Sequence, residues 1–151
     1  MSKITPFLWF DDQAEEAAEF YTSVFERSHV VTTAGPAGRV MTVAFELDGQ
    51  PFLALNGGPE HYRFNESISF LIDCSSQDEV DHYWSRLSDG GEEGPCGWLK
   101  DRFGLSWQVV PSRLPELLGD PDAERAARVM QVMMGMKKLD VALLEAAAAG
   151  D

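Results

Sequence analysis

The amino-acid sequence predicts an α+β fold in which two βαβββ modules form a curled mixed sheet around a pocket and are followed by C-terminal helices. Two observations lead to this prediction. The order of strand-like and helix-like runs in the first half recurs in the second half, and apolar positions of the two halves coincide. A stretch of different composition, rich in Met and Ala, follows the repeat. Recurrence of this kind indicates a duplicated structural unit.

The first half reads as one strand, one helix and three more strands. Residues 4–10 are apolar and aromatic, as in a buried strand. Residues 13–26 follow an Asp-Asp cap and carry apolar side chains at helical spacing. A hairpin signal, Asp48-Gly49, lies between the last two strands. The three later strands are expected at 30–33, 40–47 and 52–55.

The second half repeats this order. Residues 67–73 read as a strand, and Ser75-Ser76 caps a helix that extends to about Leu87. A short strand pair is expected around residues 98–100. The last strand is expected at residues 105–110, before Pro111 ends it.

Matching apolar positions support the duplication. A shift of 63 residues places Tyr21 on Trp84, and the same shift places Leu8 on Leu71. A shift of 55 residues aligns the last strands and places Phe52 on Trp107. The difference between the two shifts predicts a longer hairpin between the second and third strands of the first module.

The C-terminal part is expected to be helical. Asp120-Pro121 is typical of a helix start, and residues 141–149 read as a second helix that ends at Gly150. An apolar stripe on the first helix comprises Val129, Met130, Met133, Met136 and Leu139. A Met-rich stripe can bind partners adaptably, but we interpret this one as packing on its own domain or on a twin subunit. The expected divisions are a first module at 1–58, a linker at 59–66, a second module at 67–111 and a helical extension at 112–151.

Composition restricts the class of function. The net charge is −13, from 25 acidic and 12 basic residues, and such a chain repels the phosphates of nucleic acids. We interpret the excess as a solvated acidic surface, with attraction of a cationic ligand as the alternative. No apolar run approaches the roughly 20 residues of a membrane span, and no signal peptide is evident, so a cytoplasmic protein is expected. Cys74 and Cys96 form no CxxC pair, and neither a disulfide nor a metal site is expected from them.

Four stretches resemble a known family. They are ITPFLWFDDQAEEAAEFYTSVF, VAFELDGQPFLALNGGP, SISFLIDC and GPCGWLKDRFGLSWQVVP. They are similar to the PhnB-like branch, often labelled demethylubiquinone methyltransferase-like, of the vicinal oxygen chelate superfamily, which includes glyoxalase I, extradiol dioxygenases and bleomycin-resistance proteins. The resemblance implies paired βαβββ modules, a pocket for a small molecule and a homodimer.

The resemblance also locates the positions that hold a divalent metal in related enzymes. Those enzymes carry a His or an equivalent ligand on the first strand of each module and a Glu on the last. Here Gln108 stands in place of the second Glu, the repeat places Leu53 at the first, and Ser67 stands where a His is expected. Residues 4–10 contain no His at all. A hydroxyl, an amide and a leucine make a poor ligand set, so no metal and no cofactor are expected.

Several side chains could still contact a ligand. Strand alternation places Ser67, Ser69 and Gln108 on one side of the pocket, whereas the residues Leu105, Trp107 and Val109 should pack under a helix. Gln108 is a ligand contact on one interpretation and a core amide on the other. Two other groups are candidate contacts, each with packing as the alternative: Trp98 in a Gly-rich loop, and His61, Tyr62 and Arg63 in the linker.

Three functions remain open from the sequence. The first is metal-free binding of a small, partly aromatic or cationic molecule. The second is an enzyme with unusual metal or acid–base chemistry, with His61 or Glu60 as the base. The third is a structural or regulatory dimer that acts through its C-terminal helices. Methyl transfer is rejected, because the Gly-rich loop of a Rossmann-like fold is not found after the first strand.

Overall fold

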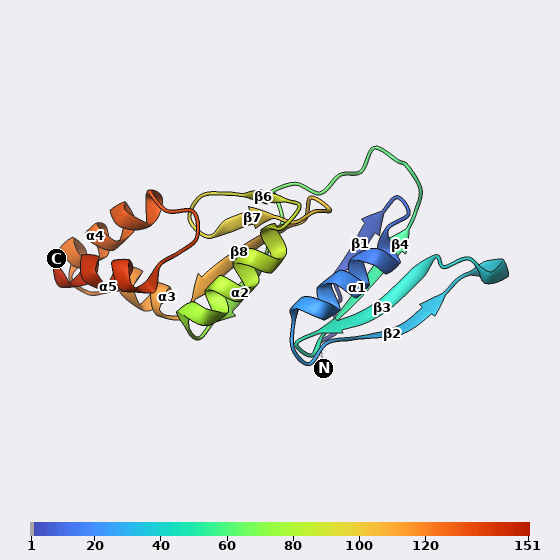
Figure 1. Ribbon diagram of the computed structural model, residues 1–151, viewed down its shortest axis with the longest axis horizontal. Helices are drawn as coiled ribbons and strands as arrows, with labels where there is room; N and C mark the ends of the chain where they lie inside the picture. Colours follow the sequence, from blue (N-terminus) through green and yellow to red (C-terminus); the bar gives the residue numbers. More distant parts are fainter. Residues whose placement is uncertain (1) are drawn as a thin grey trace. The chain divides into compact units, whose positions relative to one another are not determined.

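The computed structural model describes residues 2–151, which form two compact units, one ending at Arg63 and the other comprising Phe64–Asp151. Each unit contains one four-stranded mixed sheet with a helix on one face (Figure 1). The predicted α+β class and the paired βαβββ order are confirmed. None of the helices formed by residues 2–151 combines the length and the apolar character needed to traverse a bilayer.

The first unit has the strand order β1-β4-β3-β2. Strand β1 is parallel to β4, and the other neighbours are antiparallel. This arrangement follows from the chain order, because α1 carries the chain across the sheet after β1 and hairpins join the later strands. The elements are β1 (Phe7–Phe10), α1 (Ala14–Val24), β2 (His29–Ala34), a 3-10 turn η1 (Pro36–Gly38), β3 (Thr42–Leu47) and β4 (Gln50–Asn56).

Aromatic side chains build the core between α1 and its sheet. Tyr21 of α1 stacks on Phe45 of β3 with 6.3 Å between ring centroids, and Phe45 stacks on Phe52 of β4 at 5.3 Å. All three side chains are buried. Leu8 and Phe10 join them from β1, since alternate residues of a strand face the same side.

The second unit repeats the topology with the strand order β5-β8-β7-β6. Strand β5 is parallel to β8, and β7 is antiparallel to both β8 and β6. Helix α2 begins after Ser76, whose side chain accepts a hydrogen bond from the Glu79 amide, as expected of a helix cap. The elements of the module are β5 (Phe70–Cys74), α2 (Gln77–Ser88), β6 (Glu92–Glu93), β7 (Trp98–Lys100) and β8 (Ser106–Pro111).

The repeat is confirmed in the helices and corrected by one residue in the first strands. The shift of 63 places Tyr21 on Trp84, and both are buried. The same shift pairs buried Leu8 with Leu71, which is 58% exposed, so this predicted match is wrong. Leu8 corresponds instead to buried Ile72. The reason is the strand–helix connection, which occupies residues 11–13 in the first unit and only 75–76 in the second.

Strands β1 and β5 each begin three residues later than predicted. Strand β1 begins at Phe7 rather than Ile4, although the carbonyl of Pro6 still accepts a hydrogen bond from the Leu53 amide. Strand β5 begins at Phe70 rather than Ser67. Ser67 lies in a turn in which both its amide and its hydroxyl donate to Asn65 Oδ1, at 2.9 and 2.6 Å. This local turn competes with strand pairing at the predicted start of β5.

Three helices complete the second unit, where two were predicted. They are α3 (Arg113–Leu118), α4 (Ala123–Met134) and α5 (Val141–Ala149). The cap of α4 is Asp122, whose side chain accepts hydrogen bonds from two backbone amides, rather than the predicted Asp120. Helix α5 has the predicted bounds and ends at Gly150, whose φ of 85° suits glycine.

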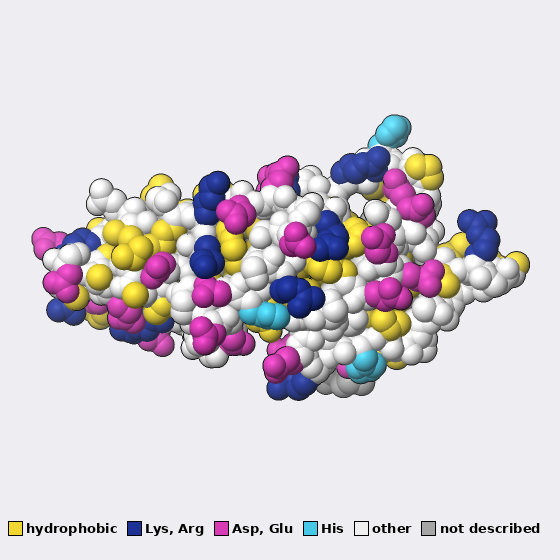
Figure 2. Space-filling view, viewed as in Figure 1, with side chains coloured by type: hydrophobic (Ala, Val, Ile, Leu, Met, Phe, Trp, Pro, Cys, Tyr) yellow, Lys and Arg dark blue, Asp and Glu magenta, His cyan; other side chains and the backbone are white. Residues whose placement is uncertain are grey.

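The predicted stripe packs mainly within its own unit, but α4 ends at Met134, so Met136 and Leu139 lie after the helix and not on it. Val129, Leu139 and Leu144 are buried with Val110 at the end of β8, and Met133 and Met136 pack against this C-terminal cluster. Met130 remains exposed. Figure 2 shows further hydrophobic side chains at the surface over α4 and α5, interspersed with charged ones.

Candidate functional site

One face of the second sheet is covered by α2, and the other carries two of the predicted ligand positions, Gln108 and Trp98. Leu105, Trp107 and Val109 are buried on the α2 side, as predicted. The opposite side, called here the helix-free face, carries Leu71, Trp98, Lys100, Ser106 and Gln108. Gln108 lies at its centre, because its neighbours across the sheet are Leu71 on one side and Trp98 on the other.

A hydrogen bond fixes the Gln108 side chain. Its amide Nε2 donates to Ser69 Oγ at 2.9 Å, so two of the predicted pocket residues are in contact. Within residues 2–151, neither Gln108 Oε1 nor the indole nitrogen of Trp98 makes a hydrogen bond. Both side chains are half-buried. The face therefore offers one oriented acceptor beside one donor on an aromatic ring.

The other predicted ligand positions lie apart from this arrangement. Ser67 is exposed in its turn, two residues before Ser69. Leu53 is half-buried in the first unit, on the side of its sheet opposite α1, where its neighbours across the sheet are Phe7 and Ala44. Leu53 therefore contributes an apolar surface and no donor atom.

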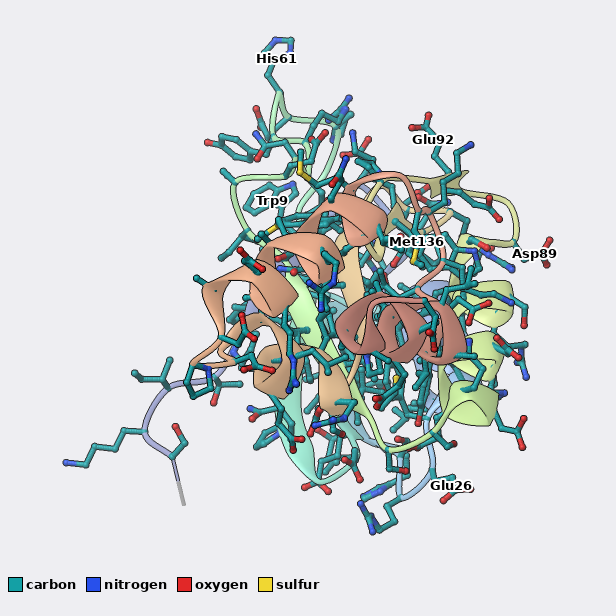
Figure 3. All side chains as sticks on the ribbon, turned by 90° about the vertical axis from the view of Figure 1, so that its left-hand side faces the viewer. Trp9, Glu26, His61, Asp89, Glu92 and Met136 are labelled. Atoms are coloured by element: carbon teal, nitrogen blue, oxygen red, sulfur yellow. The ribbon has the colours of Figure 1, made fainter. Side chains whose placement is uncertain are left out.

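The linker residues are held by contacts within the first unit. The ring of Tyr62 packs edge-on against Trp9 at 5.0 Å between centroids, and Trp9 Nε1 donates to the Gly58 carbonyl. Arg63 donates to two carbonyls of its own loop. His61 is exposed and projects away from the loop (Figure 3). The sequence reasoning missed Trp9, although its alternation with Phe7 in residues 4–10 could have placed both on one face.

These residues do not fit a divalent metal of the superfamily type. Of the four matched positions, Gln108 has an amide already bonded to Ser69, Ser67 has a hydroxyl bonded to Asn65, and the third is Leu53. The fourth falls on residues 4–10, which contain no His. Within residues 2–151 no three His, Cys, Asp or Glu side chains come close enough together to bind a metal. Neutral oxygen donors alone hold such an ion weakly.

The thiol of Cys74 is not an activated nucleophile. The residue is buried, and its desolvation, with Glu79 and Asp73 nearby, raises the pKa of the thiol to about 12. The thiol therefore stays protonated near neutral pH, whereas reactive cysteines have a lowered pKa.

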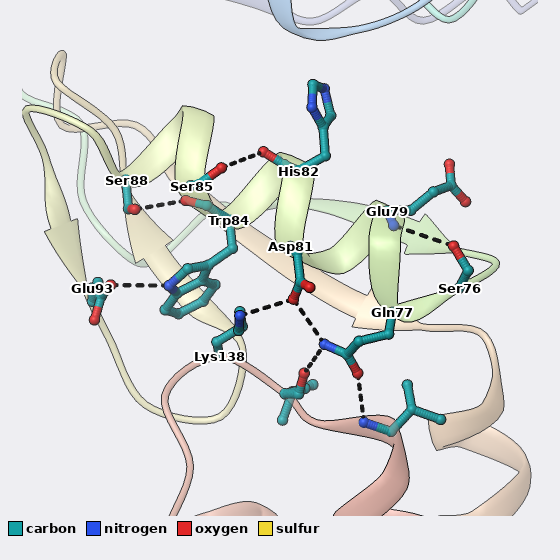
Figure 4. Close-up of polar contacts among 12 residues, drawn as sticks. Ser76, Gln77, Glu79, Asp81, His82, Trp84, Ser85, Ser88, Glu93 and Lys138 are labelled. Carbon is teal, nitrogen blue, oxygen red and sulfur yellow. Dashed lines mark hydrogen bonds and ion pairs between the residues drawn. The ribbon is translucent and has the colours of Figure 1, made fainter.

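Polar contacts join α2 to the C-terminal segment (Figure 4). The amide of Gln77 donates to the Leu139 carbonyl at 3.1 Å, and its carbonyl accepts from the Val141 amide at 2.7 Å. Asp81 accepts from Gln77 at 3.0 Å and pairs with Lys138 at 2.8 Å. These contacts are structural, and His82 on the same helix is exposed and points away from them.

Substitution of Asp81 by Asn is expected to reduce stability in a pH-dependent way. The hydrogen bonds from Lys138 and then Gln77 lower the pKa of Asp81 below its ordinary value of 3.8. A lowered pKa stabilises the folded chain above pH 3.8, and this contribution is lost as the pH falls through the folded-state value. Because Asp81 and Lys138 are substantially exposed, the loss at pH 7 should be about 1 kcal/mol or less. Urea unfolding from pH 7 to pH 3 measures it, and a difference that grew on acidification would contradict the assignment.

The duplicated strand order identifies the class of protein. Two four-stranded sheets in which the first strand is parallel to the last, each covered by one helix, define the paired βαβββ fold of the glyoxalase and bleomycin-resistance proteins, the vicinal oxygen chelate superfamily. Within it, the chain belongs to the PhnB-like family described as 3-demethylubiquinone-9 3-methyltransferase, which is matched over residues 2–110.

Solved structures agree with this assignment. A PhnB protein from Bacillus cereus is 31% identical, with a TM-score of 0.66, and the match covers 73% of this chain and 99% of that one. Protein PA1353 from Pseudomonas aeruginosa is 19% identical, with a TM-score of 0.62 and coverage of 74% and 98%. The fosfomycin resistance protein FosX from Listeria monocytogenes is 18% identical, with a TM-score of 0.56 and coverage of 79% and 98%. The last two show similarity of fold alone. No curated protein matches this chain.

Proposed function

We propose that this protein binds a small organic molecule on the helix-free face of its second sheet without the help of a metal ion. The observation that carries the proposal is the Gln108 side chain, which Ser69 orients at 2.9 Å while its carbonyl oxygen keeps a free acceptor site. Trp98 beside it supplies an indole donor and an aromatic surface. A ring stacked on Trp98 with a donor group directed at Gln108 fits this arrangement.

Methyl transfer, which the family description names, is not part of the proposal. Adenosyl methyl donors are bound by parallel sheets with a Gly-rich loop after the first strand. Both sheets here are mixed, and the connections after β1 and β5 are Asp-Asp-Gln and Ser-Ser.

An acid–base enzyme is the second candidate for the same fold, and it has less support. The two bases considered from the sequence, Glu60 and His61, are exposed on the linker loop. The contacts of that loop, between Tyr62 and Trp9 and between Arg63 and backbone carbonyls, account for its conformation without a substrate.

We also propose that the protein is a cytoplasmic homodimer. Each chain would consist of the modules 1–58 and 67–111, the linker 59–66 between them and the extension 112–151. Exposed apolar side chains support the dimer, since a monomer seldom exposes large apolar patches. Four of them lie on α4 and α5: Met130, Val132, Met134 and Leu143. The regulatory role of these helices loses support, because the C-terminal cluster makes them part of the core. Sedimentation equilibrium should give twice the mass of one chain. A monomer at micromolar protein concentration would contradict the proposed dimer.

A ligand titration followed by NMR tests the binding function. The full chain is treated with EDTA and screened against small aromatic compounds that carry donor groups. The expected result is that binders shift the side-chain amide of Gln108 and the indole of Trp98. Gln108→Leu should weaken these binders about tenfold, as expected for a lost hydrogen bond of ~1.4 kcal/mol. Gln131→Leu, at a surface position on α4, serves as the control. Binding that appears only when a divalent metal is restored would refute the proposal.

A further inference from the structure

A cavity of about 270 Å³ adjoins the Gln108 site on the second unit. Trp98, Lys100 and Ser106 line it from the helix-free face, and Glu66 and Glu92 line it from the segment before β5 and from β6. Trp98 belongs to both sites, because it is the cross-strand neighbour of Gln108. A ligand stacked on Trp98 could therefore reach Gln108 with one end and this cavity with the other.

Ser106 is the unusual residue of the cavity. It is only 1% exposed, and its Oγ has no hydrogen-bond partner within residues 2–151. A buried hydroxyl without a partner costs about 1–3 kcal/mol, so natural proteins rarely keep one without a reason. Lys100, its cross-strand neighbour, does not supply a partner, because it pairs with Glu66 at 3.2 Å. The hydroxyl is therefore available to a group that enters the cavity.

The charge of the cavity favours a cation. Three glutamates, Glu66, Glu92 and Glu93, line it against the single ammonium of Lys100, and the Glu93 carboxylate accepts a hydrogen bond from Trp84 Nε1. The pKa of Glu66 is lowered, chiefly by the hydrogen bond from Lys100, so this carboxylate is ionised at neutral pH. Trp98 adds an aromatic ring, which attracts cations, and the net charge of −13 strengthens the negative potential.

We infer that this cavity receives an ammonium group of the ligand, which donates to Ser106 Oγ and is neutralised by Glu66 and Glu92 beside the ring of Trp98. The inference rests on the proposed binding function and specifies the class of molecule, namely an amine that is protonated at neutral pH. The rest of the ligand lies toward Gln108, whose free carbonyl oxygen accepts a second donor.

Three aromatic probes of similar size and different charge test the inference: benzylammonium, benzyl alcohol and benzoate. We expect benzylammonium to shift the Ser106 amide and the Trp98 indole in NMR spectra of the full chain. Its affinity should be at least tenfold higher than that of the other two probes. Ser106→Ala should weaken benzylammonium binding about tenfold while leaving the melting temperature equal or higher, because it removes a hydroxyl without a partner. Ser85→Ala, an exposed hydroxyl on α2, is the matched control and should change neither quantity.

The outcomes separate the two proposals. Equal binding of benzylammonium and benzyl alcohol, with shifts at Gln108, would overturn the ammonium site and keep the binding function. Tight binding of benzylammonium that shifts Ser106 and leaves Gln108 and Ser69 unaffected would overturn the role of Gln108 and keep the ammonium site. Preference for benzoate, or unchanged benzylammonium affinity in Ser106→Ala, would overturn the inference.

Discussion

Truncation after Gly119 is expected to unfold the second unit and not to release an independent βαβββ module. The deletion removes Val129, Leu139 and Leu144, which are almost fully buried against Val110 and Leu114. Burial of each such side chain contributes about 1.5–3 kcal/mol, so the loss approaches the ~5–15 kcal/mol that stabilises a whole small domain. The backbone also loses partners, because the Cys96 and Gly97 amides donate to carbonyls of the segment before α5.

Circular dichroism and NMR of the truncated chain measure this effect. A matched pair of substitutions in the full chain controls for the deletion itself: Leu139→Ala, at a buried position, and Ile68→Ala, at an exposed one. The first should lower the free energy of unfolding by about 2–5 kcal/mol and the second by less than about 1 kcal/mol. A truncated chain whose second unit unfolds cooperatively and gives a dispersed NMR spectrum would contradict this prediction. It would show that the second module is stable without the C-terminal helices.

Replacement of Asp101 by Ala should be the most damaging single change in the hairpin that joins β7 to β8. The carboxylate is 2% exposed and accepts three hydrogen bonds: from the Phe103 amide at 2.8 Å, the Leu105 amide at 3.1 Å and Trp107 Nε1 at 2.8 Å. Alanine leaves these buried donors without this acceptor. We expect a loss of about 3–5 kcal/mol in the free energy of unfolding, because each buried donor without an acceptor costs about 1–3 kcal/mol.

Chemical denaturation measures this loss, and a second aspartate provides the control. Asp89 faces Arg102 at 3.4 Å with an exposed carboxylate, so Asp89→Ala should cost less than about 1 kcal/mol. Asp101→Asn keeps the shape but replaces one acceptor oxygen with a donor, and it should fall between the two. Equal losses for Asp101→Ala and Asp89→Ala would mean that the buried carboxylate does not organise the hairpin.

Much of the fold was predictable from periodicity and turn chemistry. The spacing of Tyr21 and Val24 matched that of Trp84 and Leu87, since helices bury residues at fixed intervals. Helix α5 was placed correctly because Gly150 marks its end. The start of β5 was not, because Ser67 finds a partner in Asn65 by a local turn that composition does not reveal. Helix α3 was missed, since its short run after Pro111 has too few turns to show a period.

The candidate site was predictable in part. Strand alternation placed Ser69 and Gln108 on one side, where they are in contact, and the same alternation could have added Ser106 and Lys100. Glu66 could not be found in this way, because it reaches Lys100 from a turn outside the strands. The linker residues His61 and Arg63 were chosen by composition alone. Composition does not distinguish a side chain that contacts a ligand from one that, like Arg63, hydrogen-bonds to the backbone of its own loop.

Binding of Mn²⁺, followed by the electron paramagnetic resonance of the free ion, tests whether the chain has a divalent-metal site of the superfamily type. We propose that no such site exists here, because Leu53, Ser67 and Gln108 stand at the positions where the family resemblance implies metal ligands. Excess Mg²⁺ suppresses weak binding to the acidic surface. We expect the free Mn²⁺ signal to be undiminished when the chain is added. Loss of one equivalent of signal per chain, with paramagnetic broadening centred on Gln108, would contradict it.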